Sequence, residues 1–380
     1  MIKDIENPFI VIGYESPMFF CDRETETEDL LQHLRNGNNV VLSSPRKIGK
    51  TGLILHLFHR IKKENPKAVV VYVDLFLTED LSSFTHLFAS KLLEGLDENP
   101  TRILKTITLF LKGIRPSLSL DEMTGAPRFG VDFEKGERRY TLTKLFESIQ
   151  SSDKEYFIAF DEFQQIDNYP EKNVEAILRS YIQNIHNAHF IFSGSQTHLL
   201  SEMFLSAKRP FYQSADHQSL GPIDEGAYYK FAAVFFKKQG RPFNEDLFHL
   251  IYQKYEGHTW YIQKVLNQLY KKKAATLDET TLNEAILQIW KENEYYYQMI
   301  LRAYSPGQVK LLKAIAREGT IKEITAGSFI TRNGLTATSS VKSALKRLLD
   351  DEIVYLSNKG YLIYDRFFGE WLSYTFINRP

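Results

Sequence analysis

The chain has little cysteine: Cys21 is the single one among 380 residues. A lone cysteine excludes an intramolecular disulfide and a zinc site built from cysteines, and it is typical of a protein from a reducing compartment. No apolar run approaches the roughly 18 residues that a membrane-spanning helix needs. The first residues carry no signal-peptide pattern. We therefore expect a cytoplasmic protein that has no membrane partner.

The chain also lacks net charge, because 47 basic residues balance 47 acidic ones. No global field therefore draws it to nucleic acid or to an anionic membrane. Internal repeats and low-complexity segments are missing as well. What remains is an ordinary globular composition, with 43% hydrophobic and 25% charged residues, and a length that suits two or three domains.

The most informative feature that is present is the loop at residues 44–51, between an apolar run at 40–42 and an amphipathic run at 53–61. It fits G-x-x-x-x-G-K-[ST] at every fixed position except the first, where Ser44 replaces glycine. Loop N–H groups and a helix N-terminus attract anions. Lys50 would reach the β- and γ-phosphates of a nucleotide, Thr51 would sit on Mg²⁺, and Gly49 would let the backbone approach phosphate. The predicted nucleotide-binding residues are Ser44, Pro45, Arg46, Lys47, Ile48, Gly49, Lys50, Thr51 and Gly52. The alternative is a surface turn that happens to contain Gly-Lys-Thr.

An acidic pair ends a second apolar run. Residues 156–160 read as a strand that is covered on both faces, and Asp161 and Glu162 follow it. Asp161 would hold Mg²⁺, directly or through water, and Glu162 would orient and activate the attacking water. The alternative is a strand followed by an ordinary polar turn.

A third apolar run, at residues 189–192, ends in small polar residues. At the tip of a strand beside Asp161, Ser195 or Gln196 would hydrogen-bond the γ-phosphate or the lytic water. The alternative is a strand-to-helix turn in which a serine caps the helix.

Strand and helix patterns alternate over the first 220 residues, with a further buried strand at 69–75, which predicts an α/β fold with a mostly parallel sheet and helices on both faces. Residues 115–139 read as a long loop or hairpin. After 221–222 the strand signal stops, and residues 224–298 read as helices. From residue 305 onward the pattern has the order of a winged helix-turn-helix. It predicts a helix at 308–317, a short mixed segment, a helix at 339–350 capped at Thr338-Ser339, and a hairpin that turns at residues 358–360.

Together these elements resemble the archaeal-type ATPases of the AAA+/STAND group of P-loop NTPases, which also occur in bacteria. The resemblance covers residues 17–372 and rests on the loop at 45–51, the Asp-Glu strand end at 160–164, the Gly-Ser strand tip at 193–195, and an Arg-Glu box. That box reads Asp22, Arg23, Glu24 and Glu26. The resemblance implies a P-loop ATPase core over 1–220, a helical lid over 221–300 and a winged-helix domain over 301–380. It also implies ATP as ligand and Mg²⁺ as cofactor, with ATP hydrolysis.

Two further sites follow from the resemblance alone. The lid turn, Gly257-His258-Thr259, carries threonine where the family has proline, and it would touch nucleotide; His258 would face phosphate or be merely structural. Arg209, after the Gly-Ser strand, would act on a nucleotide in cis or in trans, since its planar fork suits a phosphoryl charge. The alternative for Arg209 is a solvated surface pair with Lys208.

The C-terminal unit is locally basic, with twelve basic against seven acidic residues over 302–379. Lys342, Lys346 and Arg347 would share a helix face, and Ser339, Ser340 and Ser343 would approach bases or phosphates. DNA contact and protein contact both stay open. The expected function is an ATP-binding, ATP-hydrolysing regulatory switch whose ATP or ADP state controls the binding of DNA, a protein partner or a second copy. The alternative is a nucleotide-stabilised scaffold with negligible hydrolysis.

Overall fold

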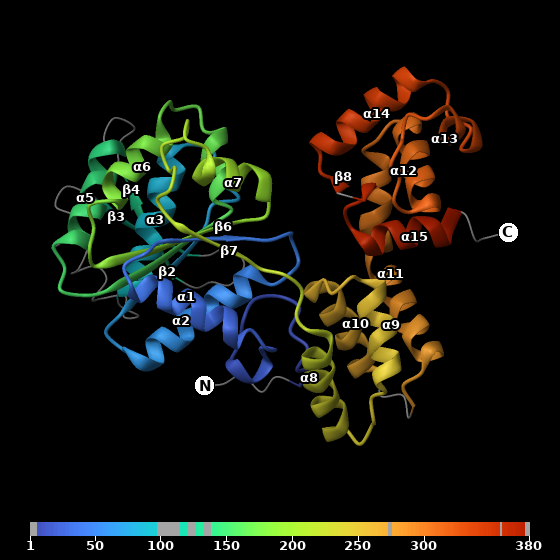
Figure 1. The fold of residues 1–380 in the computed structure, drawn as a ribbon, viewed down its shortest axis with the longest axis horizontal. Coiled ribbons are helices and arrows are strands. Elements are labelled where there is room, and N and C mark those ends of the chain that lie inside the picture. The colour runs from blue at the N-terminus through green and yellow to red at the C-terminus, as the bar shows by residue number, and fades with distance from the viewer. Residues whose placement is uncertain are drawn as a thin grey trace. The chain divides into compact units, whose positions relative to one another are not determined.

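A computed structural model describes residues 6–96, 115–120, 127–132, 138–272, 276–357 and 359–376. The chain forms two compact units (Figure 1). The first comprises Met1–Ala232 and Glu256–Gln263, and the second comprises Ala233–Tyr255 and Lys264–Pro380. The predicted domain boundaries at 220 and 300 stay a prediction. No helix in the described ranges combines the length and apolarity that crossing a bilayer requires.

The first unit is built on a five-stranded sheet whose strand pairs are all parallel. In spatial order the strands are β2 (Val69–Asp74), β5 (Tyr156–Asp161), β6 (Ala188–Gly194), β1 (Val40–Ser43) and β7 (Asp216–Ser219). This arrangement confirms the predicted fold class. Strand β7 was not predicted, because its four residues are all polar. It lies at the sheet edge and, among the described strands, pairs with β1 alone.

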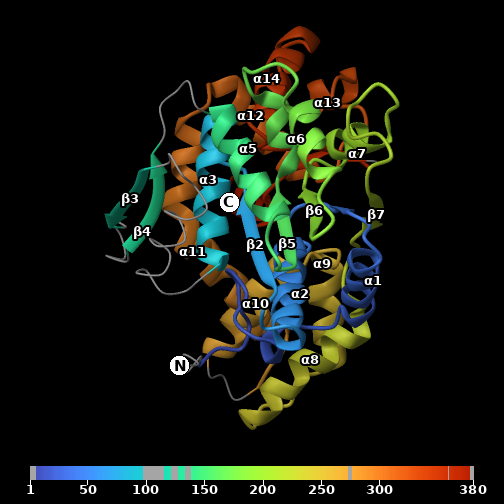
Figure 2. The same ribbon diagram turned by 90° about the vertical axis from the view of Figure 1, so that its left-hand side faces the viewer.

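Helices cover both faces of this sheet (Figures 1 and 2). One face packs against α1 (Glu24–Arg35) and α2 (Lys50–Glu64), and the other packs against α3 (Leu81–Leu96), α5 (Arg138–Gln150), α6 (Val174–Ile182) and α7 (Thr197–Leu205). The strand β5 serves both cores, since Ile158 and Phe160 face one and Phe157 and Ala159 face the other. A strand that is apolar on both sides shows no alternation, which is why its sequence reads as one continuous apolar run.

Shorter elements complete the first unit. They are η1 (Pro17–Phe19), η2 (Phe163–Asn168), β3 (Arg115–Leu120), β4 (Pro127–Asp132) and the beginning of α8 (Glu225–Lys238). β3 and β4 pair antiparallel, which confirms the hairpin reading of that stretch, and β4 contacts α3 (Figure 2). The sequence at 81–114 alternates apolar and polar residues at helical spacing; α3 lies in its first part, and residues 97–114 lie outside the described residues.

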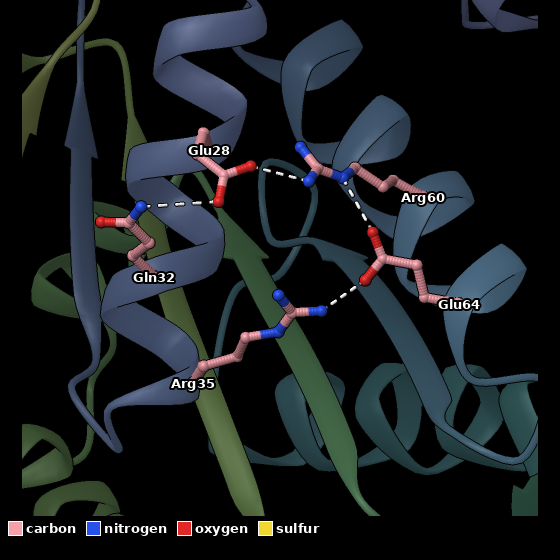
Figure 3. Close-up of polar contacts among 5 residues, drawn as sticks. All are labelled: Glu28, Gln32, Arg35, Arg60 and Glu64. Carbon is pink, nitrogen blue, oxygen red and sulfur yellow. Dashed lines mark hydrogen bonds and ion pairs between the residues drawn. The ribbon is translucent and has the colours of Figure 1, made fainter.

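Helix α2 is braced against α1 by charged side chains (Figure 3). Arg60 of α2 donates to Glu28 of α1 at 2.6 Å and to Glu64 at 3.0 Å, and Arg35 of α1 bonds Glu64. These groups are partly exposed, so water and salt screen each pair and it contributes little to stability. The buried face of α2 does the main packing, and its first residues are the ones that the site requires.

The second unit is helical apart from one hairpin. Its elements are α9 (Glu245–Lys254), most of α10 (Thr259–Lys271), α11 (Glu279–Arg302), α12 (Pro306–Glu318), α13 (Gly327–Arg332), α14 (Thr338–Asp350), β8 (Val354–Ser357), β9 (Gly360–Ile363) and α15 (Arg366–Phe376). The predicted order of three helices and a hairpin is confirmed in α12, α13, α14 and β8–β9. Aromatic side chains pack α15 against α11: Tyr297 contacts Phe368 and Trp371, with 5.3 Å between ring centroids in each pair.

One local prediction in the second unit is corrected. The predicted cap at Thr338-Ser339 is wrong, because α14 begins at Thr338 and its N-cap is Ala337, which makes no side-chain bond. The built capping box is on α12, where Ser305 and Gln308 bond each other's backbone. In the hairpin turn Asn358 lies outside the described residues, but Gly360 is required, since a Cβ there would lie 2.5 Å from the Ile321 carbonyl oxygen.

Candidate functional site

The loop between β1 and α2 folds around a buried ammonium group. Lys50 is the first residue of α2, is only 7% exposed, and donates from Nζ to the Ser44 carbonyl oxygen at 3.1 Å. Gly49 has φ +110°, a backbone conformation that favours glycine. Burial lowers the pKa of Lys50, and the negative charges of Asp161 and Glu162 oppose that shift. A buried cation at a helix N-terminus suits a strongly anionic ligand.

Asp161, the last residue of β5, collects hydroxyl donors. Its Oδ2 accepts from Thr51 Oγ1 at 3.0 Å and from the Tyr72 hydroxyl at 2.6 Å, and its Oδ1 accepts from Ser193 Oγ. The structure thus brings together Thr51 and Asp161, which are 110 residues apart. The sequence analysis did not single out Tyr72 and Ser193 as site residues. Both lie on strands beside β5 in the sheet, and only the strand order reveals this.

Glu162 follows in the left-handed region with φ +52°. Its Oε2 accepts from Gln164 Nε2 at 2.6 Å, from Ser195 Oγ at 2.9 Å and from the Ser195 backbone N–H at 3.2 Å. Arg46 in the loop donates from Nε to Ser195 Oγ at 2.9 Å. A chain of hydrogen bonds therefore runs from the phosphate loop to the acidic pair. The capping interpretation of Ser195 is wrong, because the N-cap of α7 is Gln196.

Gln164 fits beside Glu162 only because residue 194 is glycine. A Cβ on Gly194 would lie 2.1 Å from Gln164 Oε1, which is a direct clash. Gln164 is 5% exposed, and within the described part of the chain its Oε1 has no hydrogen-bond partner. The side chain is thus held by packing and by its bond to Glu162.

A cavity of about 480 Å³ opens between these groups. The loop at 46–52, Asp161 and Glu162 form part of its wall, and the wall as described does not include Ser44 or Pro45 of the predicted nucleotide-binding residues. The N-terminal segment at 10–16 and residues 19–21 form another part, which sequence reasoning missed. Within it, the Tyr14 hydroxyl bonds His56 Nδ1 at 3.0 Å, and Phe20 stacks on His56 with ring centroids 4.3 Å apart. Burial raises the pKa of Tyr14 to about 12, so the phenol stays neutral.

The lid turn reaches this cavity through its last residue. Thr259, Trp260 and Gln263 belong to the wall, and Thr259 donates from Oγ1 to the Ile48 carbonyl oxygen at 2.8 Å. The wall as described does not include His258; its carbonyl accepts the N–H groups of Tyr261 and Ile262 at the start of α10. A contact of His258 with phosphate stays a prediction.

Two arginines that the sequence analysis singled out are bound to carboxylates. Arg209 pairs with Asp167 at 2.8 Å and with Glu175 at 2.6 Å, so it is not the solvated surface pair of the alternative interpretation. Its pKa is raised: burial alone would lower it, but the bond to Asp167 and the charge of Glu175 outweigh burial. Arg23 is 4% exposed and donates to Glu26 at 2.5 Å and to the Gly221 carbonyl oxygen at 2.6 Å.

The groups on the wall fit a nucleotide with its metal. Cations, loop amides and a helix N-terminus suit a polyphosphate. Over the described residues no cluster of three or more histidine, cysteine or acidic side chains could hold a metal alone. Mg²⁺ bound with a nucleotide needs only one or two protein ligands besides phosphate and water, and Thr51 and Asp161 offer that set.

Comparison with known families agrees with this geometry. Residues 20–265 match the family described as an ATPase domain predominantly from Archaea, and residues 295–374 match the one described as "Probable winged helix domain". The fold is that of a P-loop ATPase domain. The chain belongs to this archaeal-type ATPase family and carries a C-terminal winged helix domain.

Individual relatives are distant in sequence. An uncharacterized ATP-binding protein of Methanocaldococcus jannaschii is 24% identical over 319 residues, which are 76% of this chain and 83% of that protein. A Walker-type ATPase of Pyrococcus abyssi has a similar structure, with TM-score 0.62 and 18% identity over 96% of this chain and 99% of that one. The Aeropyrum pernix ORC2 protein, solved as ADPNP–ADP complexes, gives 0.59 and 17% over 97% of each chain. The ORC1 protein of the same organism, solved in complex with DNA, gives 0.58 and 13%, again over 97% of each chain. At these identities the structural likeness shows the fold alone.

Proposed function

We propose that this chain is a cytoplasmic, Mg²⁺-dependent ATPase with slow turnover, whose nucleotide state switches the binding of DNA or a protein. The observation that carries the proposal is the 3.0 Å bond between Thr51 Oγ1 and Asp161 Oδ2. It joins the phosphate loop to the acidic end of β5, beside a buried lysine and a cavity of about 480 Å³. Separate surface turns would not converge in this way.

Each residue of the site has a distinct task in this proposal. The loop amides and Lys50 bind the β- and γ-phosphates, while Thr51 and Asp161 hold Mg²⁺, which when bound neutralises charge on those phosphates. Glu162 accepts a proton from water as the water oxygen bonds the γ-phosphorus. The bond from that phosphorus to the bridging oxygen breaks, and ADP leaves with the bond's electron pair. Ser195 sets the position of the Glu162 carboxylate through their 2.9 Å bond.

The decisive experiment compares wild type with Glu162→Gln in steady-state ATP hydrolysis, with and without duplex DNA. We expect turnover to fall about 10²–10³-fold in the variant while ATP affinity is kept, because the amide cannot take the proton. Undetectable turnover in both proteins, with tight ATP binding, would favour the alternative of a nucleotide-stabilised scaffold. DNA stimulation that is lost in the variant favours the switch.

Arg209 is the proposed trans-acting residue. In a single chain, where no neighbouring nucleotide is present, the guanidinium pairs instead with Asp167 and Glu175 of its own chain. A second copy would then be the partner, and the specific activity of wild type would rise with protein concentration. Arg209→Ala should remove that rise. A concentration-independent activity in wild type contradicts the trans role.

The winged helix is proposed as the partner-binding module, with DNA as the partner to be tested first. Ser339, Lys342, Ser343, Lys346 and Arg347 are exposed on α14, although Arg347 pairs with Asp351 at 2.8 Å. Reversing charge in Lys342→Glu with Lys346→Glu should weaken DNA binding about tenfold and flatten its salt dependence. An unchanged DNA affinity would leave a protein partner as the interpretation of this face.

A further inference from the structure

The phosphate loop is bonded to the first residues of α10 along two successive peptides. Thr259 Oγ1 donates to the Ile48 carbonyl oxygen at 2.8 Å, and the Trp260 N–H donates to the Lys47 carbonyl oxygen at 3.0 Å. Both residues of α10 belong to the first compact unit, together with the loop. Neither bond follows from the phosphate-loop pattern, which fixes no residue type at positions 47 and 48.

The side chain of Lys47 adds a third attachment. Its ammonium lies 4.4 Å from the ring centroids of both Trp260 and Tyr261 and donates to the Tyr261 hydroxyl at 2.9 Å. Two aromatic faces attract a cation, most strongly where water is partly excluded. Lys47 also has φ +67°, which is unfavourable for a residue with a Cβ. The surrounding contacts hold it there, as expected for a functional loop.

Peptide geometry gives these attachments a consequence for anion binding. In a trans peptide the carbonyl and the following N–H point in opposite directions. The carbonyls of Lys47 and Ile48 point at α10, so the N–H groups of Ile48 and Gly49 point away from it. Fixed N–H groups bind an anion without a cost for reorienting them.

We propose that Lys47, Thr259 and Trp260 are positioning residues of the nucleotide site, a loop latch that orients the amides of Ile48 and Gly49 toward phosphate. The inference rests on the proposed ATP binding and deepens it. Thr259 is central, because its side-chain hydroxyl supplies one of the bonds that hold the loop. In this chain the hydroxyl also lies 4.0 Å from where a Cβ of Gly49 would be, so it fits closely against the glycine.

The test measures the affinity of the full-length chain for a fluorescent ATP analogue in Thr259→Val and Thr259→Ser. The valine keeps the shape and loses the donor, so affinity should fall about five- to tenfold, while serine keeps the donor and should stay within about twofold of wild type. Lys47→Met should weaken binding about threefold. Hydrogen exchange at the loop amides should accelerate in the valine and methionine variants and not in the serine variant.

Two control variants and one replacement variant accompany this affinity measurement. Thr331→Val and Lys291→Met change exposed residues outside the first unit and should leave affinity unchanged. If Thr259→Val fails to fold, Tyr261→Phe removes one hydroxyl and tests the aromatic half of the latch by the same assay. Valine and methionine variants that bind like wild type overturn the latch, even where Lys50→Ala abolishes binding. If wild type itself binds no better than Lys50→Ala, the proposed ATP site fails instead.

Discussion

Two acidic clusters in the first unit are built differently. Around Asp161 the donors are the neutral hydroxyls of Thr51, Tyr72 and Ser193. Around Glu175 the donor is the charged guanidinium of Arg209 at 2.6 Å. The first arrangement fixes a carboxylate without cancelling its charge, so the charge stays available to a cation. The second arrangement neutralises the charge of the Glu175 carboxylate, and the resulting ion pair stabilises the fold.

Lys50, the cation beside Asp161, also leaves the charge of that carboxylate unneutralised. The charge of Asp161 acts on the pKa of Lys50, yet the ammonium donates to Ser44 and not to the carboxylate. Burial raises the pKa of Tyr72, and the charge of Asp161 raises it further, so the phenol remains a donor at any physiological pH. Substitutions around Asp161 should therefore change ligand binding, and those around Glu175 should change stability.

The largest effect is expected for Lys50→Ala. Removing the buried ammonium takes away the main charged partner of a polyphosphate, so ATP affinity should fall at least about 100-fold, measured by calorimetric titration. The melting temperature without nucleotide should change little, since Lys50 is desolvated and its loss relieves that cost. Unchanged affinity would remove the loop from the proposed site.

Gly194→Ala should cost about 30-fold in turnover while ATP affinity is kept. The new methyl group would displace Gln164, and Glu162 would lose a donor 2.6 Å away. Single-turnover and binding measurements separate the two quantities. A second substitution, Gln164→Ala, should restore space without restoring turnover; recovery of turnover in the double variant would show that Gln164 does not position Glu162.

Arg209→Ala should instead lower the free energy of unfolding by about 2 kcal/mol, because Glu175 would stay buried without its partner. Burial already raises the pKa of Glu175. The folded protein therefore holds that proton more tightly than the unfolded chain, and stability falls as pH rises through the window between the ordinary and the raised pKa. The loss in the variant should shrink below that window. Arg35→Ala, from an exposed pair, is the control and should cost about 0.5 kcal/mol or less in denaturant titrations.

The smallest effect is expected for Tyr72→Phe. Asp161 would lose one of its hydroxyl donors and become less well oriented, so the Mg²⁺ concentration at half-maximal nucleotide binding should rise about fivefold. Nucleotide affinity without Mg²⁺ should not change. A fall in stability with no change in the Mg²⁺ requirement would show that Tyr72 supports the fold and does not orient Asp161.

The fold class could be predicted from the sequence, and so could a candidate loop at 44–51, for a physical reason. Phosphate binding constrains consecutive residues, so Gly49, Lys50 and Thr51 form a local pattern, and a doubly covered strand such as β5 is apolar throughout. Tyr72 and Ser193 escaped prediction because their bonds to Asp161 depend on the strand order. The turn at 257–259 was named from the resemblance, but the bond from Thr259 to Ile48 was not predicted, because the two residues are 211 positions apart in the sequence. The edge strand β7 was not predicted, because its polar residues show no apolar pattern.

The close approach of Gln164 to Gly194 also bears on how related sequences can vary. An amide that occupies the space of a missing side chain ties the two positions together, although they are 30 residues apart. A relative with alanine or serine at the second position should carry a smaller residue, or one turned elsewhere, at the first. Substitutions at these two positions should therefore be inherited as a pair, and their joint history is readable from any sufficiently deep collection of homologues.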